Sequence, residues 1–177
     1  MDFADRRVRF ENLMHEVVEP VRRYLARRTD QATADDVLSE TLLALWRRID
    51  DVPEDAIPWA IGVARLQLAN AQRAIRRQNR LFVRVATVDP PQQVPDHADS
   101  DIGYILDAVA SLRPLDAEVL RLWAWDDLTL PQIADALGIS VNAATIRLHR
   151  ARTRLREELG KTVDQPGHTG VKDGDRT

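Results

Sequence analysis

The chain has 177 residues, of which 44% are hydrophobic and 30% charged, so it can form one domain or two small ones with packed cores. It contains no cysteine, which excludes disulfides, thiol catalysis and a cysteine-type zinc site. The formal net charge is −3, so any binding to nucleic acid must come from local basic patches. There is no apolar run long enough to span a membrane and no signal peptide, so we expect a cytoplasmic protein.

The first part of the chain predicts two helices. Apolar residues at helical spacing run from Phe10 to Leu25. Pro20 interrupts this stripe, and because proline removes a backbone donor and clashes with the preceding turn, we expect a kink or two short helices. A second helix is predicted to open at Thr33, with Asp36 as the capping-box acid. Its predicted core face consists of Val37, Leu38, Leu42, Leu45 and Ile49.

A third, longer helix is predicted to begin between Glu54 and Pro58 and to end near Arg80. Proline is tolerated in the first turn of a helix, and apolar residues then recur at spacings of three and four. The other face is basic, and no acid occurs between Asp55 and Asp89. Such a face is either a solubilising surface or a phosphate-binding one. Its arginines are Arg65, Arg73, Arg76, Arg77 and Arg80.

Composition changes in residues 83–101, which we predict to be a flexible, acidic, proline-rich linker. Residues 87–101 hold three prolines and four aspartates but no lysine or arginine. This segment is either a passive tether or a stretch whose negative charge mimics nucleic acid inside a basic channel. The expected fold is therefore all-α, with two small helical domains at 5–82 and 102–160 and a disordered tail at 161–177.

The second domain is predicted to contain four helices, of which the last two form a helix-turn-helix. Two short amphipathic helices come first, the second of them starting at Pro114. Thr129 and Gln132 then form a capping box that opens the third helix. Gly138 suits the left-handed conformation that ends a helix, and Ser140 can cap the fourth.

The last helix has an apolar face and an opposite face suited to a DNA major groove. Between Asp135 and Glu157 there is no acid, although arginine recurs from Arg147 to Arg156. The alternative is an ordinary helical hairpin whose arginines form a solvated surface. The face predicted to meet DNA consists of Asn142, Ile146, His149, Arg150 and Thr153, flanked by Thr145 and Arg147.

No pattern in the chain indicates an enzyme or a resident cofactor. The histidines are scattered, and none has the spacing of a metal site or stands beside a nucleophile pattern. There is also no glycine-rich phosphate loop. We therefore expect neither catalytic residues nor a bound metal. The four histidines are His15, His97, His149 and His168.

Three stretches, taken in order, resemble one family. TADDVLSETLLALWRR, at 33–48, resembles the polymerase-binding helix of bacterial sigma factors. PWAIGVARLQLANAQRAIRR, at 58–77, resembles the helix that faces the −10 promoter element. The segment 102–160 resembles the −35-binding domain, including the run RLHRAR. The order and the lengths of these three stretches resemble those of an extracytoplasmic-function sigma factor. This is the short group of the sigma-70 family, with only two sigma domains.

The resemblance implies a function and a set of partners. It implies a dissociable sigma factor that binds core RNA polymerase, through the β′ clamp and the β flap, and directs promoter-specific transcription initiation. Promoter DNA and an anti-sigma factor are the other implied partners. The near-neutral charge agrees with a subunit whose partner supplies most of the grip on DNA. The alternatives are a stand-alone helix-turn-helix regulator, which would bind palindromes as a dimer, and a helical adaptor.

The resemblance also implies roles for single residues. The surface expected to dock on the β′ clamp consists of Asp35, Asp36, Leu38 and Glu40. The residues expected to contact DNA near the −10 element are Arg65, Asn70, Arg73, Arg76 and Arg77, with the loop 50–55 beside a flipped base. The −35 set is Asn142, Thr145, Ile146, Arg147, His149, Arg150 and Arg152. Among the −35 set, Arg147 and Arg152 are expected to contact phosphates. The residues expected to face the bases are Thr145, Ile146, His149 and Arg150.

Overall fold

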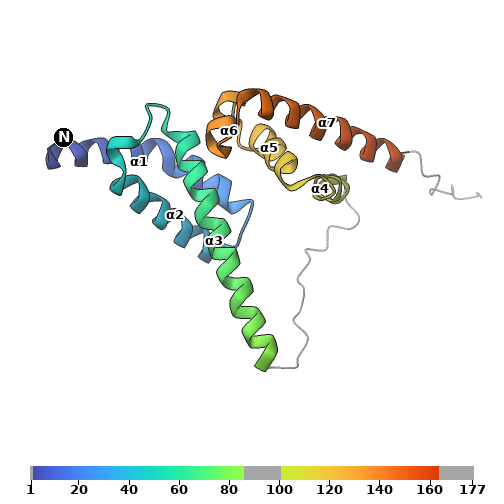
Figure 1. Ribbon diagram of the computed structural model, residues 1–177, viewed down its shortest axis with the longest axis horizontal. Coiled ribbons are helices and arrows are strands. Elements are labelled where there is room, and N and C mark those ends of the chain that lie inside the picture. The colour runs from blue at the N-terminus through green and yellow to red at the C-terminus, as the bar shows by residue number, and fades with distance from the viewer. Residues whose placement is uncertain (1, 86–100, 164–177) are drawn as a thin grey trace, which may run out of the picture.

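The computed structural model describes residues 2–85 and 101–163, with side-chain detail for 2–78 and 105–160 (Figure 1). Every regular element in these ranges is helical, as the sequence predicts. The helices are α1 (Phe3–Ala26), α2 (Gln31–Arg47), the single 3₁₀ turn η1 (Ile49–Asp51), α3 (Ala56–Val85), α4 (Asp101–Ala110), α5 (Pro114–Ala124), α6 (Leu130–Leu137) and α7 (Val141–Val163).

The first helix, α1, is a single helix in spite of its internal proline. Pro20 lies inside it, so the predicted alternative of two short helices is wrong. The carbonyl that loses its partner belongs to Glu16, an exposed residue, and water can satisfy it. Tertiary packing of the stripe through Val17, Val21 and Leu25, all fully buried, outweighs the local cost of the proline.

Helix α2 begins three residues earlier than predicted. Asp30, not Thr33, is its N-cap, and the Asp30 carboxylate accepts a hydrogen bond from the Thr33 backbone N–H at 3.0 Å. Aspartate caps a helix at least as well as threonine, so the earlier residue takes the position. The hydrogen bond from the Thr33 amide, followed by one from its hydroxyl, lowers the pKa of the Asp30 carboxyl.

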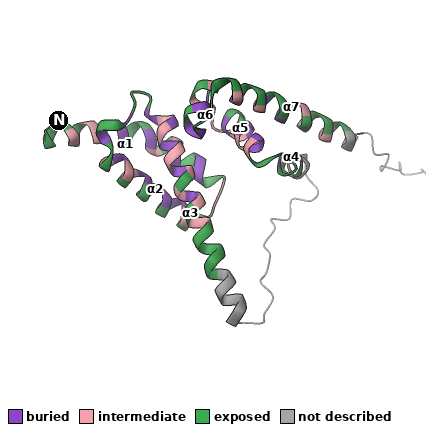
Figure 2. Ribbon diagram, in the orientation of Figure 1, coloured by how far each residue is buried: buried purple, intermediate pink, exposed green. Residues whose placement is uncertain are grey.

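Helix α3 is longer than its core. Its first half packs between α1 and α2, where Ala60, Ile61, Ala64 and Leu68 are buried. Farther along, Ile75 belongs to the same stripe but is 44% exposed, and Figure 2 shows this end of α3 emerging from the bundle. The helix continues to Val85, so it includes the first residues of the predicted linker, whose remainder, 86–100, lies outside the described residues. The tail from 164 onward also lies outside them.

The helix-turn-helix follows the sequence prediction closely. Thr129 and Gln132 form the reciprocal capping box, and α6 ends at Gly138, whose φ of 64° is left-handed. Ser140 then caps α7, because its Oγ accepts a hydrogen bond from the Ala143 backbone N–H at 3.1 Å. Pro114 opens α5 as predicted.

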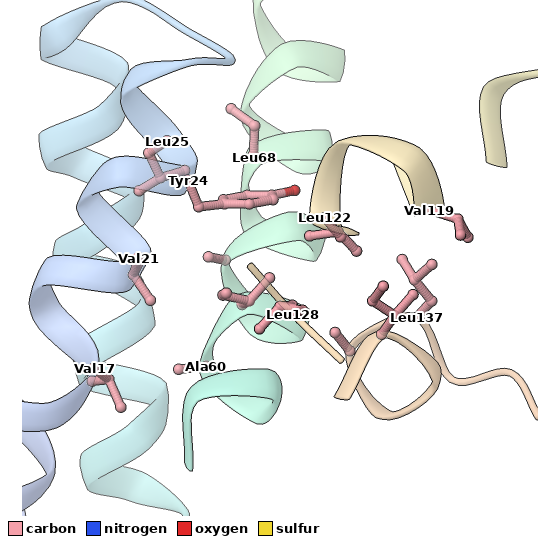
Figure 3. Close-up of a cluster of buried hydrophobic side chains, with 14 of the residues drawn as sticks. Val17, Val21, Tyr24, Leu25, Ala60, Leu68, Val119, Leu122, Leu128 and Leu137 are labelled. Atoms are coloured by element: carbon pink, nitrogen blue, oxygen red, sulfur yellow. The ribbon is translucent and has the colours of Figure 1, made fainter. Parts of the chain in front are cut away.

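The two halves of the molecule pack against each other. One hydrophobic core runs through both, and α6 lies directly on α3. Figure 3 shows Tyr24 reaching from α1 across α3 toward Leu122 of α5, with Leu128 placed between the halves. Gly62 makes the close approach possible: a Cβ there would lie 2.9 Å from the Ala136 carbonyl oxygen.

Candidate nucleic-acid and partner interfaces

Helix α7 presents an exposed polar face supported by a buried apolar one. Ala144, Leu148 and Ala151 are buried against the rest of the domain. On the other side Ile146 is 42% exposed, so its side chain is available for contact with a partner. The structure brings five residues of the predicted −35 set together on this outer face. They are Asn142, Thr145, Ile146, His149 and Arg150, all exposed.

Both predicted phosphate contacts on α7 already have partners inside the domain. An Nη1 of Arg147 lies 2.8 Å from the carboxylate of Asp116, a buried residue of α5, and the Arg147 Nε is buried without a hydrogen-bond partner. The Arg152 guanidinium lies 5.1 Å from the centre of the Trp123 ring. Arg147 therefore fastens α7 to α5, a role that periodicity could not reveal because Asp116 is far from it in sequence.

A polar cavity beside α7 contains cations that the sequence reading did not single out. It measures about 670 Å³ and lies between the α4–α5 turn and α7. Arg113 and Arg154 line it together with His149 and Arg150. Arg113 is also the N-cap residue of α5, and no side chain caps that helix. Asp116 and Glu157 also line the cavity, and the first residue of α5 is Pro114, which has no backbone N–H, so the cavity carries charges of both signs.

On α3 the predicted −10 residues divide into two groups. Asn70, Arg73, Arg76 and Arg77 are exposed on the part of the helix that leaves the bundle, and the Arg73 guanidinium donates to the Asn70 side-chain oxygen at 2.5 Å. Arg65 is different, because it is half-buried and its Nε is buried without a partner. It lines a cavity of about 600 Å³ between α1, α3 and α5.

The predicted polymerase-binding surface on α2 is acidic, but one predicted member is not on it. Asp35, Asp36 and Glu40 are exposed. Leu38 is only 8% exposed, so it belongs to the core and a partner cannot reach it. Leu43 is 45% exposed and shares a helical face with Asp36 and Glu40, so it is the apolar residue of this surface.

The acidic loop between α2 and α3 is fastened at several points. Asp50 pairs with Arg6 at 2.7 Å and Asp51 with Arg48 at 3.6 Å. Asp55 accepts a hydrogen bond from the Gln132 side chain of α6 at 2.9 Å. The loop expected beside a flipped promoter base is therefore held by α1 on one side and by the C-terminal half on the other.

An apolar groove of about 600 Å³ lies between α4, α5 and α7. Ile105, Leu120, Trp123 and Leu155 line it, with Arg156 near its edge. Ile105 and Trp123 are 41% and 40% exposed. Periodicity predicts that α4 and α5 are amphipathic, but it does not reveal a groove that three helices form together.

A charged cluster joins α1 to the α5–α6 turn. The Arg28 guanidinium lies 2.9 Å from the Asp126 carboxylate, 3.5 Å from that of Glu118 and 3.7 Å from the centre of the Tyr24 ring. The Tyr24 hydroxyl donates to Glu118 at 3.2 Å. Burial, and then the nearby negative charge of Glu118, raises the pKa of the Tyr24 hydroxyl. Burial also raises the pKa of Asp126, although its arginine neighbours act in the opposite direction.

Among the described residues, no group of histidine, aspartate and glutamate side chains is arranged to hold a metal ion. Within the same ranges, no helix is both long enough and apolar enough to cross a membrane.

Comparison with known proteins finds two matching family models, one for each half. Residues 13–81 match Sigma-70 region 2, and residues 102–155 match Sigma-70, region 4. The chain is 34% identical over 149 residues to the ECF RNA polymerase sigma factor SigL of Mycobacterium tuberculosis, covering 79% of this chain and 84% of SigL. It is 31% identical over 156 residues to the RNA polymerase sigma factor CarQ of Myxococcus xanthus, covering 86% and 90%.

Two solved structures share the fold. One is the sigma factor RpoE in complex with the anti-sigma factor NepR from Bartonella quintana, with a TM-score of 0.60, 19% identity, and coverage of 88% of this chain and 98% of that one. The other is CnrH in complex with the cytosolic domain of CnrY, with a TM-score of 0.57, 22% identity, and coverage of 86% and 88%.

Proposed function

The chain belongs to the extracytoplasmic-function family of RNA polymerase sigma factors, and we propose that it works through the surfaces described above. It binds core RNA polymerase reversibly and directs initiation at promoters with a matching −35 and −10 element. The observation that carries this proposal is the exposed face of α7, which combines Arg150, His149 and Ile146 on a fully capped helix-turn-helix. The protein acts in the cytoplasm beside the polymerase and has no catalytic activity of its own.

The −35 element is read by the outer face of α7. Arg150 can donate two hydrogen bonds to a guanine, and Ile146 can pack on a thymine methyl group. Thr145 contributes to recognition mainly through the shape of its side chain, because its hydroxyl already donates a hydrogen bond to the Val141 carbonyl at 2.9 Å. Asn142 and His149 complete the reading face.

Phosphates beside the −35 element are held by the polar cavity next to α7. Arg113 and Arg154 both line this cavity, and phosphate contacts of this kind fix the register of a recognition helix. Arg152 supports binding from the Trp123 side. Arg147 is left out of this set because Asp116 already holds it.

The −10 region is contacted by the exposed end of α3. Arg73, Arg76 and Arg77 supply positive charge to the DNA backbone, and Asn70 stands beside them. Arg65 extends this surface toward the start of the helix. A strand that tracks along α3 would then reach the loop before it, where Asp55 lies.

The acidic face of α2 docks on the β′ clamp. Asp35, Asp36 and Glu40 provide the charge, and Leu43 provides the apolar contact that the buried Leu38 cannot. The groove between α4, α5 and α7 takes an apolar helix, from the β flap in the polymerase or from an anti-sigma factor in the inhibited state. One solved neighbour, RpoE of Bartonella quintana, is a complex with an anti-sigma factor.

Reconstitution with core RNA polymerase tests the proposal. The purified chain should co-elute with core enzyme in gel filtration and should support run-off transcription from the promoter upstream of its own gene. A variant carrying Asp36→Arg and Glu40→Arg should lose both properties, whereas Arg7→Glu, on an exposed part of α1, should keep them. A chain that never binds core enzyme, yet protects a palindromic DNA site alone, would instead be a stand-alone regulator.

A further inference from the structure

The loop between α2 and α3, residues 48–55, has little regular structure to define its shape. Its one regular element is the short turn η1, which no described side chain caps. A backbone hydrogen bond from the Asp51 N–H to the Arg48 carbonyl, at 2.9 Å, closes this turn. Ile49 and Val52 are buried, whereas Asp50 and Asp51 are exposed. Because a single 3₁₀ turn is weak by itself, contacts from outside the loop must help to keep it in one conformation.

Two arginines of α1 provide such contacts, on both sides of η1. The Arg6 guanidinium lies 2.7 Å from the Asp50 carboxylate and donates to the Trp46 carbonyl oxygen at 3.3 Å. It also lies 5.7 Å from the centre of the Trp46 ring. Arg9 donates to the Val52 carbonyl oxygen at 2.8 Å. The first part of α1 therefore lies beside η1 (Figure 1) and is hydrogen-bonded to the chain before, within and after it.

The face of α1 decides which of its arginines reach the loop. Arg6 and Arg9 are three residues apart, so they share a helical face, and both are half-buried. Arg7 lies between them in sequence but is exposed and pairs with Glu11 of the same helix at 3.2 Å. Arginine suits the two inner positions because its planar group can donate in several directions at once. Arg7 therefore provides a matched control for the other two.

The contacts of Arg6 and Arg9 affect the loop in different ways. Val52 is only 4% exposed, so loss of Arg9 would remove a charged donor from the carbonyl of a buried residue. The side chains of Arg6 and Asp50 are 29% and 55% exposed, and an ion pair as exposed as this adds little to folding stability. Its main effects are to orient the start of the loop and to neutralise a carboxylate on an acidic surface.

We propose that Arg6 and Arg9 are positioning residues for recognition of the −10 element. They hold the loop in the conformation that accepts an unstacked promoter base, and they act through the Asp50 carboxylate and the Val52 carbonyl without contacting DNA. This proposal rests on the function proposed above. A loop that is already in its binding conformation loses less conformational entropy when the base enters. If the loop becomes mobile, affinity for the matching base falls with the fraction that stays competent.

Variants of Arg9 test whether the hydrogen bond holds the loop. Arg9→Met keeps a long side chain but removes the donor, whereas Arg9→Lys keeps a donor that can reach the Val52 carbonyl. Hydrogen exchange of the backbone amides of residues 49–52, measured in the free full-length chain, should be faster in Arg9→Met and close to the wild type in Arg9→Lys. Arg7→Met should leave these amides unchanged. Unchanged exchange in Arg9→Met would overturn the proposed support of the loop.

Promoter binding by the holoenzyme then tests the consequence for recognition. The holoenzyme of each variant is titrated with the promoter upstream of its own gene and with copies that carry each other base at the −10 positions. Arg9→Met should lower the preference for the matching base by up to about tenfold, the effect of losing one hydrogen bond from a charged group. Arg9→Lys and Arg7→Met should keep the preference of the wild type.

Exchanging the two members of the Arg6 pair separates loop shape from charge. Arg6→Asp places two carboxylates side by side and should lower the −10 base preference, as Arg9→Met does. Combining it with Asp50→Arg restores an ion pair of opposite polarity, so the double variant should recover at least part of the preference. Failure of the double variant to recover any preference would contradict an action of Arg6 through Asp50.

The outcomes distinguish this proposal from the function on which it rests. Equal losses on matching and mismatched promoters would overturn the positioning role, because the two arginines would then affect only charge or folding. Unchanged base preference in spite of faster exchange would overturn it as well. If the wild-type holoenzyme prefers no base at any −10 position, the proposed function fails instead, and the exchange measurement still reports on the loop because it uses the free chain.

Discussion

The N-terminal and C-terminal halves of the molecule each carry one arginine-rich helix, and the two helices are built differently. On α7 the central residues of the outer face are free, and the arginines at its edges, Arg147 and Arg152, contact other helices of the same domain. On α3 Arg73, Arg76 and Arg77 are exposed, and Arg65, nearer the start, is half-buried in a cavity that α5 helps to line. Arginine density therefore does not identify nucleic-acid contacts, since the neighbouring helices decide which arginines are available.

The largest difference between the two helices is expected in stability. Leu148 on α7 and Ile75 on α3 both continue an apolar stripe, but Leu148 is 7% exposed and Ile75 is 44% exposed. Leu148→Ala should lower the free energy of unfolding by about 2–5 kcal/mol, because it leaves a cavity under the recognition helix. Ile75→Ala should change it by less than about 0.5 kcal/mol. Urea unfolding followed by circular dichroism compares them, and equal losses would show that the protruding part of α3 is packed.

On α7 itself, substitutions at Arg150 and at Arg147 should have different effects, the first on DNA recognition and the second on the stability of the domain. Arg150→Ala should weaken binding to a matching −35 duplex by about 1–3 kcal/mol and leave binding to random duplex nearly unchanged. Arg147→Ala should instead destabilise the domain by about 1–3 kcal/mol, because it leaves the buried Asp116 carboxylate unpaired. Holoenzyme binding to the two duplexes, with thermal unfolding of each variant, measures both effects. A specific loss with Arg147→Ala alone would reverse the assignment.

On α3, Arg73 should behave as a phosphate contact without sequence preference. Arg73→Ala should weaken binding of single-stranded DNA similarly for all sequences and reduce the slope of log K against log salt by about 0.7. Titrations at several salt concentrations measure this slope. The same substitution at Arg65 should reduce the slope less than Arg73→Ala does, because Arg65 is half-buried in the cavity between α1, α3 and α5.

How much the sequence could predict differs between local and long-range features. The capping box at Thr129 and the left-handed Gly138 depend on residues a few positions apart, and both were predictable. The start of α2 was predicted wrongly because Asp30 and Thr33 are both good caps and only the folded chain chooses between them. Periodicity correctly placed Leu38 on the core face of α2, and only the family resemblance placed it on the polymerase-binding surface. Packing leaves Leu43 as the exposed leucine there.

The contacts between residues far apart in the chain could not be predicted from the periodicity of the sequence. The pairing of Arg147 with Asp116 and of Arg28 with Asp126 joins residues that lie far apart in the chain. A helical wheel assigns an arginine to a face, but it does not say which other helix covers that face. The covered state of Arg65 and the groove between α4, α5 and α7 follow from such packing, so both appear only once the halves are assembled.

The smallest expected effect distinguishes how the two halves cap their helices. A carboxylate caps α2 in the N-terminal half, through Asp30, whereas hydroxyls cap α6 and α7 in the C-terminal half, through Thr129 and Ser140. Because the pKa of Asp30 is lowered by its bond from Thr33, its contribution to stability is complete above the unfolded-state pKa of about 4 and is lost as pH falls through the lower folded-state value. Asparagine caps a helix as well as aspartate but does not titrate, so the stability of Asp30→Asn should fall further below that of the wild type as the pH rises.

The difference in melting temperature between the wild type and Asp30→Asn should therefore increase from pH 3 to pH 7. Ser140→Ala should lower the melting temperature by the same amount at both pH values. If the difference between wild type and Asp30→Asn is independent of pH, the carboxylate charge contributes nothing to the cap, and the two halves are capped alike.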